Sequence, residues 1–349
     1  MVAFRWKRKG ICVILFSFFT LCGGLAFFLY GMTVLSTSLE RLAGHRLERV
    51  LRHMTSGPGR SLLLGTCITI ALQSSSAMTV MLVSLVNSGV MKLGQTIGVI
   101  MGSNIGTTLT PWILALTGIE SENFFLTLLN PQNLSSPLAL IGVFLVMLSS
   151  VARRRSIGHI LVGFSLLMCG MEIMSQAVEP LTVLPQFSQL LITFQNPLWG
   201  VLVGTVFTGL IQSSTASIGI LQTLATTDSI TYAMAIPIIL GQNIGTCVTA
   251  LLSSIGTSSN AKKVAWLHIL FNLFGTILCM VLLFGSDLLL RFHFMNLPVD
   301  AGGIAFCHTI FNLITTLLLL PFSRQLEQLA VDPKRLFSNH RHRLRPTLR

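Results

Sequence analysis

Two short polar clusters interrupt otherwise apolar stretches of this 349-residue chain. They are QSSS, formed by Gln73, Ser74, Ser75 and Ser76, and QSST, formed by Gln212, Ser213, Ser214 and Thr215. Hydroxyl and carboxamide groups donate and accept hydrogen bonds, so a cage of them suits an oxyanion, whose oxygens only accept. The same side-chain oxygens, together with free backbone carbonyls, suit a hard cation such as sodium.

Neither cluster contains an arginine or a lysine. The charge of an anion bound there would therefore have to be offset by the positive ends of helix dipoles and by a co-bound cation. Serine and threonine also serve as hydrogen-bonding residues between closely packed membrane helices. Two matched clusters favour a binding site over packing alone.

A second pair of motifs follows the clusters at the same distance. GSNIGT contains Asn104 and Thr107, and GQNIGT contains Asn243 and Thr246. Glycine permits a break in a helix, and a break exposes backbone donors that can hold an anion. We therefore predict helix breaks at Gly102, Gly106, Gly241 and Gly245, with the asparagines and threonines in the site.

The motifs belong to an internal repeat. GTCITIALQSSSA from Gly65 aligns with GTVFTGLIQSSTA from Gly204, an offset of 139 residues. The same offset aligns GMTVLSTSLE from Gly31 with GMEIMSQAVE from Gly170. Because polar residues and glycines match as well as apolar ones, shared hydrophobicity does not explain the similarity, and the clusters belong to a repeated structural unit.

The composition is that of a membrane protein. Hydrophobic residues make up 52% of the chain and charged residues 10%, well below the roughly 25% of an average soluble domain. Apolar runs long enough to cross a bilayer as helices recur along the chain. The net charge of +12 lies in clusters at helix ends and in the tail, which indicates anionic lipid and membrane topology rather than nucleic acid.

The apolar runs predict an all-α polytopic fold with two repeats. Each repeat has a long helix (11–39, 157–180), a Gln-Ser segment and a glycine-broken helix (94–116, 231–255), with further helices at 137–152, 262–285 and 301–321. The expected organisation is a basic segment 1–10, a first repeat with its connecting helix 11–152, a second repeat 153–255, two additional helices 256–322 and a basic tail 323–349.

Basic loops predict the orientation, because positive loops stay in the cytoplasm. The pattern closes if both Gln-Ser segments are re-entrant hairpins, which gives seven full spans, a cytoplasmic C-terminus and two repeats of inverted topology. The basic RWKRK segment near the N-terminus then falls outside, against the same rule.

Other polar residues carry weaker signals. In HILFN and HTIFN, His268 and His308 each precede an asparagine by four residues, which favours hydrogen bonding between helices over substrate contact. Glu172 aligns with Thr33, so we place it outside the repeated machinery, with proton coupling as the less favoured alternative. The seven cysteines lack metal-like spacing, and no enzymatic motif, metal or resident cofactor is predicted.

The paired clusters, each followed by NIGT, resemble the type II sodium-dependent phosphate cotransporter family over roughly residues 11–322. The resemblance implies sodium-coupled phosphate transport by alternating access, with both motif pairs forming the site in a bacterial inner membrane. The chain departs from relatives in ending soon after the last helix and in lacking a His-x-x-Phe-Asn helix after the first NIGT. Transport of another oxyanion or a dicarboxylate, and a non-transporting phosphate sensor or scaffold, are the alternatives.

Overall fold

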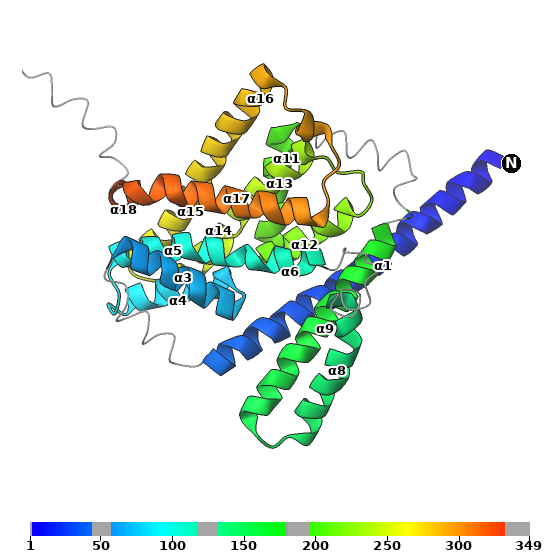
Figure 1. Ribbon diagram of the computed structural model, residues 1–349, viewed down its shortest axis with the longest axis horizontal. Helices are drawn as coiled ribbons and strands as arrows, with labels where there is room; N and C mark the ends of the chain where they lie inside the picture. Colours follow the sequence, from blue (N-terminus) through cyan, green and yellow to red (C-terminus); the bar gives the residue numbers. More distant parts are fainter. Residues whose placement is uncertain (1, 44–56, 117–130, 179, 181–195, 332–349) are drawn as a thin grey trace, which may run out of the picture.

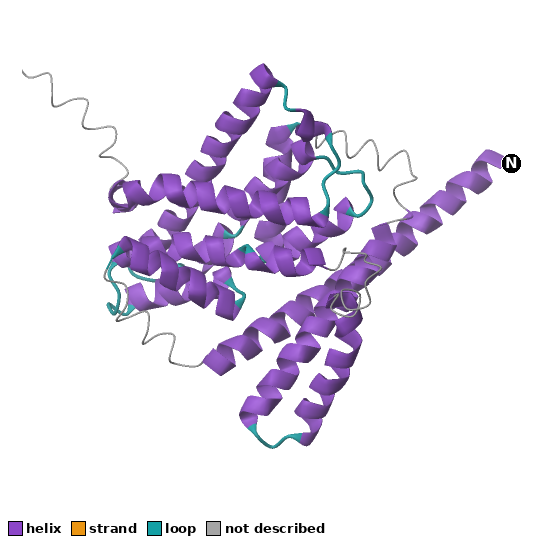
Figure 2. Cartoon of the chain, viewed as in Figure 1, coloured by secondary structure: helices purple, strands orange, loops and turns teal. Residues whose placement is uncertain are grey.

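The computed structural model describes residues 2–43, 57–116, 131–178, 180 and 196–331, and this part of the chain is almost entirely helical (Figures 1 and 2). The helices are α1 (Val2–Ala43), α3 (Pro58–Leu72), α4 (Ser75–Asn87), α5 (Leu93–Thr107), α6 (Leu109–Ala115), α8 (Pro131–Leu148), α9 (Ala152–Val178), α11 (Pro197–Ile211), α12 (Ser214–Ala225), α13 (Tyr232–Gly245), α14 (Cys247–Ser253), α15 (Ser259–Cys279), α16 (Gly285–Leu290), α17 (Ala301–Leu319) and α18 (Ser323–Val331).

Six helical stretches among the described residues are long and apolar enough to cross a membrane. They are Ile14–Leu42, Leu93–Ala115, Ala152–Val178, Tyr232–Ser253, Ser259–Leu290 and Ala301–Val331. The seventh predicted span corresponds to α8, whose described residues form a shorter apolar helix, as do α3, α4 and α11. The all-helical, membrane-embedded class is confirmed.

The two copies of the sequence repeat make equivalent contacts. In the first copy α3 packs against α5, and Thr66 Oγ1 donates to Gly102 O at 3.0 Å. In the second copy α11 packs against α13, and Thr205 Oγ1 donates to Gly241 O at 3.2 Å. The two bonds are related to each other by the 139-residue offset, so the repeat extends from sequence to three-dimensional packing.

Both helices that carry the NIGT motifs are interrupted near the end of these motifs, but not at all four of the predicted glycines. Helix α5 continues through Gly102 and Gly106, and α13 continues through Gly241 and ends at Gly245. The interruptions lie at the following threonines, Thr108 and Thr246. The glycines instead allow close packing, because a Cβ atom at any of them would collide with the α3 or α11 backbone.

Helices α1 and α9, which start the two copies, pack against each other (Figure 1). A Cβ on Gly31 would lie 2.6 Å from Gly163 O, and one on Gly24 would lie 2.9 Å from Gly170 O. Gly163 and Gly170 are the repeat equivalents of Gly24 and Gly31, so the contact is reciprocal and the two helices are antiparallel. Helix α8 lies beside α9, and α1, α8 and α9 form a group apart from the other helices. We call the other helices the body.

Helices α15 and α17 occupy equivalent places in the body. Helix α15 packs against α4, α5, α13 and α14, while α17 packs against α12, α13, α5 and α6. Exchanging the two copies converts one set of neighbours into the other. The His-x-x-Phe-Asn helix absent from the sequence after the first NIGT is thus supplied in space by α17.

The segment predicted as a tail begins as a packed helix. Helix α18 buries Leu326 and Ala330 in the core cluster that also contains Ile97 and Leu267. Residues 332–349, the remainder of the predicted tail, lie outside the described residues.

Replacing a glycine of α3 by alanine tests the close packing of α3 on α5. Gly65 faces the Val99 backbone with no room for a Cβ, whereas a Cβ on Gly59 in the same helix would meet nothing within 4 Å. Both alanine variants gain similar helix propensity, so their difference isolates the collision. We expect Gly65→Ala to be less stable to thermal unfolding in detergent than Gly59→Ala by about 1–3 kcal/mol. Equal stability of the two variants would contradict the backbone contact.

Candidate functional site

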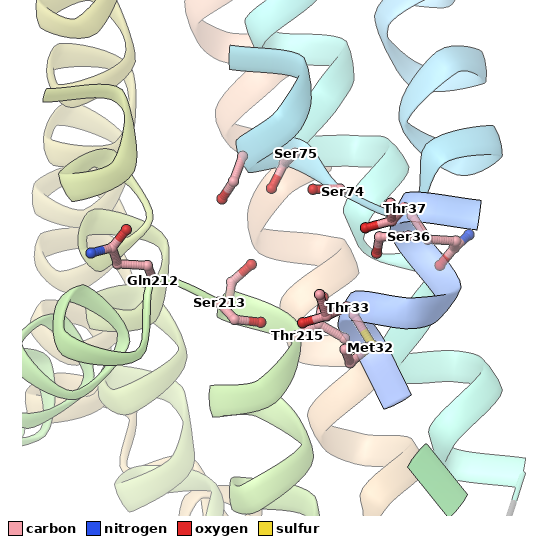
Figure 3. Close-up of a pocket in the computed structure, with 12 residues that line it drawn as sticks. Met32, Thr33, Ser36, Thr37, Ser74, Ser75, Gln212, Ser213 and Thr215 are labelled. Atoms are coloured by element: carbon pink, nitrogen blue, oxygen red, sulfur yellow. The ribbon is translucent and has the colours of Figure 1, made fainter. Parts of the chain in front are cut away.

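Both Gln-Ser clusters line one cavity of about 230 Å³ (Figure 3). Its wall consists of all eight residues of the clusters together with four residues of α1, namely Met32, Thr33, Ser36 and Thr37. The clusters are separated by 139 residues in the chain, and the fold brings them face to face. This convergence was predicted from the sequence, and the contribution of α1 was not.

Each cluster is a tight turn between two short helices. Gln73 ends α3 in the left-handed conformation, with φ of 53°, and its N–H donates to Thr69 O at 2.7 Å. Gln212 ends α11 with φ of 57°, and its N–H donates to Thr208 O at the same distance. The left-handed region is sparsely occupied by residues other than glycine and asparagine. Its use at both glutamines shows that the turn geometry is repeated.

The next residue of each cluster caps the following helix. Ser74 Oγ accepts from Ala77 N at 3.1 Å, and Ser213 Oγ accepts from Ala216 N at 3.2 Å. The helices α4 and α12 therefore begin at the cavity, and Ser75 and Ser214 in their first turns line it. Two positive helix ends and a set of hydroxyl groups face one space, which suits an anion rich in acceptor oxygens.

The ends of helices, and not positively charged side chains, would offset the charge of an anion bound in the cavity. None of the described residues that line the cavity is charged. Helix ends carry roughly half an elementary charge each, so two of them do not neutralise a multiply charged anion. A co-bound cation would supply the remainder, and hydroxyl and carboxamide oxygens are ligands that hard cations accept.

The two glutamines differ in their side-chain contacts. Thr110 Oγ1 donates to Gln73 Oε1, and Gln73 Nε2 donates to Ile70 O at 2.7 Å. Gln212 is exposed and points away from Ser213 (Figure 3). Thr249, the equivalent of Thr110, has a buried Oγ1 without a partner in the part of the chain that the structure describes. The second copy thus has the threonine of this contact but not the contact.

The asparagines and threonines of the NIGT motifs do not line the cavity. Thr107 Oγ1 donates to Ser103 O at 2.9 Å, and Thr246 Oγ1 donates to Asn243 O at 2.6 Å. Asn243 Nδ2 donates to Ile239 O at 2.9 Å, whereas Asn104 Nδ2 is buried without a partner among the described residues. Their binding role stays a prediction, and their observed contacts are within the helices.

Sequence reasoning missed Thr33, Ser36 and Thr37. Their spacing is the signal that could have found them, because polar residues at i, i+3 and i+4 share one face of a helix. In α1, an apolar membrane helix, such a face is unusual and indicates a polar neighbour. Glu172, the equivalent of Thr33, does not line the cavity and accepts from Gln176 Nε2 at 2.7 Å.

The His-x-x-Phe-Asn helices contribute to packing. Asn272 Nδ2 donates to His268 O at 3.0 Å and contacts Cys247 Sγ at 3.4 Å, so α15 is joined to α14. Asn312 Nδ2 donates to His308 O at 2.9 Å within α17. The predicted hydrogen bonding between helices is confirmed for Asn272. The Nδ1 atoms of both histidines are buried and unpartnered among the described residues.

Comparison with known families identifies the chain. The sequence pattern of the Na+/Pi-cotransporter family matches two stretches, residues 27–176 and 166–297, whose starts are separated by the repeat offset. The chain belongs to the Na+/Pi-cotransporter family. The resemblance stated from the paired QSSS and QSST motifs is confirmed, and the protein is an integral membrane protein of a transporter family.

Several relatives support this assignment. A Bacillus subtilis protein, YqeW, is 30% identical over 89% of this chain and 95% of its own length. An Escherichia coli protein named for inorganic phosphate export, YjbB, is 26% identical over 86% of this chain, which spans 53% of that relative. Human sodium-dependent phosphate transport protein 2B is 33% identical over 30% of this chain and 16% of its own length. No solved structure matches the chain.

A glycine substitution at Gln212 separates binding from stability in this family member. Because Gln212 has φ of 57° and an exposed side chain, Gln212→Gly relieves backbone strain and removes the carboxamide. We expect unfolding stability to rise by about 1 kcal/mol while phosphate binding measured by calorimetry weakens. Asp228, with φ of 53°, gives the control Asp228→Gly, which should gain stability and keep binding. Unchanged binding in Gln212→Gly would remove this side chain from the site.

Proposed function

We propose that this protein is a secondary active transporter that couples sodium to the movement of inorganic phosphate by alternating access. The observation that carries the proposal is the one cavity lined by both Gln-Ser clusters, where two helix N-termini and hydroxyl groups meet and no described lining residue is cationic. Phosphate offers acceptor oxygens to these donors, and sodium supplies the positive charge that the side chains lack.

The antiparallel contact of α1 with α9 supports inverted repeats. These helices are equivalent in the two copies, and each is long and apolar enough to cross the membrane. Equivalent helices that cross in opposite directions place the copies in opposite orientations. Such repeats form a site at their interface in many secondary transporters.

The lengths of the cluster helices support re-entrant hairpins. Helices α3 and α4 have 15 and 13 residues, and α11 and α12 have 15 and 12. A membrane-crossing helix needs about 20 residues, so each pair suits entry and exit on one face. With the basic loops of the sequence, this arrangement favours a cytoplasmic C-terminus in a bacterial inner membrane.

The relatives' names bear on substrate and direction. Relatives are named for sodium-dependent phosphate transport and for inorganic phosphate export. The cavity chemistry is the same in both directions, and the ion gradients set the net direction of a coupled transporter. We therefore propose phosphate as the substrate and sodium as the coupling ion, with direction as a property of the gradients.

Phosphate uptake into proteoliposomes tests the proposal directly. The purified protein is reconstituted and radiolabelled phosphate is followed under an inward sodium gradient, with potassium or proton gradients as controls. We expect accumulation that requires sodium and falls at least about tenfold in Ser75→Ala and Ser214→Ala, because each change removes a buried hydroxyl from the cavity. Ser84→Ala, an exposed position in α4, is the matched control and should transport normally.

Two results would contradict the mechanism. Accumulation in potassium alone would remove sodium coupling, and normal transport in both cavity variants would remove the paired site. Loss of signal in Ser84→Ala as well would point to damaged insertion.

Substrate competition separates phosphate from the alternative anions. A cage of donors around four oxygens should accept arsenate, which has the same tetrahedral shape, in place of phosphate. We expect excess arsenate to inhibit uptake strongly and excess succinate to leave it unchanged. Inhibition by succinate alone would instead favour a dicarboxylate transporter.

A further inference from the structure

The two copies of the repeat are related in sequence and internal packing but differ in how they meet the α1/α9 pair. Helix α1 contacts α3 and α12, and α9 contacts α12. The repeat pairs α1 with α9, α3 with α11, and α4 with α12. If the two copies were exchanged, the contact of α1 with α3 would become one of α9 with α11. The contacts of α1 and α9 with α12 would become contacts of α9 and α1 with α4. Among the described residues, those three pairs have at most marginal contact. The α1/α9 pair therefore contacts the two copies unequally, although the body itself is nearly symmetric. We call this set of contacts between the pair and the body the present seating.

Individual residues show the same asymmetry. Phe28 of α1 is fully buried, and its ring would touch a Cβ placed on Gly219 of α12. Their repeat equivalents are Leu167 of α9 and Val80 of α4, and Val80 is 39% exposed. The place on α4 that corresponds to the seat of Phe28 is thus open.

The starts of α4 and α12 differ in the same direction. Thr215 and Ala216 of α12 are 5% and 0% exposed, whereas their equivalents Ser76 and Ala77 of α4 are half-buried. The side of the cavity formed by α12 is covered by the α1/α9 pair, and the side formed by α4 is less covered.

The pair and the body are each held together by close contacts between helices. Helices α1 and α9 approach at backbone distance through their glycines, and the body is held by equally close contacts of α3 with α5 and α11 with α13. Contact between pair and body is much smaller. Because the exchange maps α1 and α9 onto each other and the repeated helices of the body onto one another, it defines a second seating with the same packing among these helices, in which α9 replaces α1. Helices α8 and α18 lie outside the repeat and do not take part in the exchange.

Resting on the proposed transport function, we propose that a second seating of the α1/α9 pair places Glu172, Ser175 and Gln176 of α9 against the two Gln-Ser clusters. These residues are the repeat equivalents of Thr33, Ser36 and Thr37, which line the cavity in the present seating. Met171 likewise corresponds to Met32. The wall of the cavity thus changes from three hydroxyl side chains to one hydroxyl, one carboxamide and one carboxylate.

In the second seating Glu172 takes the place that Thr33 has in the cavity wall, so the two seatings differ in charge. In the present seating the lining has no charged side chain among the residues that the structure describes. In the second seating a carboxylate faces the anion and repels it, while it attracts a cation. Glu172 therefore lowers the affinity for phosphate on the membrane face to which the second seating opens, and it acts as a residue that sets the affinity difference between the faces.

Cross-linking tests the second seating independently of any substrate. In a background with the seven native cysteines changed to alanine, Leu167→Cys and Val80→Cys are combined and treated with a short bis-methanethiosulfonate reagent. We expect an intramolecular cross-link, even though α4 and α9 barely touch in the present seating. Phe28→Cys with Gly219→Cys is the matched pair for the present seating and should also cross-link.

The outcomes of this experiment are distinct. Cross-linking of both pairs supports the exchange. Cross-linking of the Phe28 and Gly219 positions alone overturns it, whether or not the protein transports phosphate. Absence of phosphate transport in the parent protein would overturn the proposed function while the cross-link still reports on the seating.

Affinity measured from the two faces tests the role of Glu172. Oriented proteoliposomes give the apparent KM for phosphate on each side, for the parent, Glu172→Thr and Glu172→Gln. We expect both variants to lower the KM roughly tenfold on one face only, which reduces the difference between the faces. Glu40→Gln removes a carboxylate from α1 outside the cavity lining and should leave both values unchanged. An equal change on both faces, or none, would overturn the assignment.

Discussion

A helix that begins inside an apolar medium leaves backbone N–H groups that only protein or ligand can satisfy. The cavity of this protein meets that constraint twice, because α4 and α12 both start at the cavity and Ser75 and Ser214 in their first turns are buried. Ser74 and Ser213 each satisfy one N–H group through a side-chain oxygen. The first residues of both helices, which carry the remaining first-turn donors, line the cavity. The same need that forces a cap at each helix start therefore also creates an environment that favours an anion.

Glycine makes the rest of the arrangement possible. The α3–α5 and α11–α13 pairs approach so closely that side chains beyond hydrogen do not fit at the contact. Without a hydrophobic driving force between helices in lipid, such close packing and hydrogen bonds hold helices together. The bonds from Thr66 and Thr205 across these contacts act in the same way. Each cluster is thus carried on a rigid helix pair, and the distance between the clusters is set by how the two pairs meet.

The two copies are alike in their internal contacts but differ in their contacts with α1 and α9. Equivalent contacts within each copy give the site two similar halves, which suits a substrate surrounded by donors on all sides. Unequal contacts with α1 and α9, and the different contacts of Gln73 and Gln212, mean that the halves are in different states at one moment. The proposed transport cycle needs two such states of similar free energy, and the proposed second seating would supply the second state by reusing the packing of the first.

The sequence by itself determined the membrane class, the helical fold, the repeat and the eight cluster residues, because composition and polar matches at a fixed offset are local, readable quantities. It misplaced the helix breaks, since the NIGT glycines serve contacts with α3 and α11 that no local pattern reveals. Only the tertiary structure decided that α1 contributes Thr33, Ser36 and Thr37 to the cavity wall. It also decided that α17 packs against the first copy as α15 packs against the second. The NIGT asparagines and threonines do not line the cavity, which the sequence did not indicate. These facts depend on which helices meet in space, and that is set by packing between segments far apart in the chain.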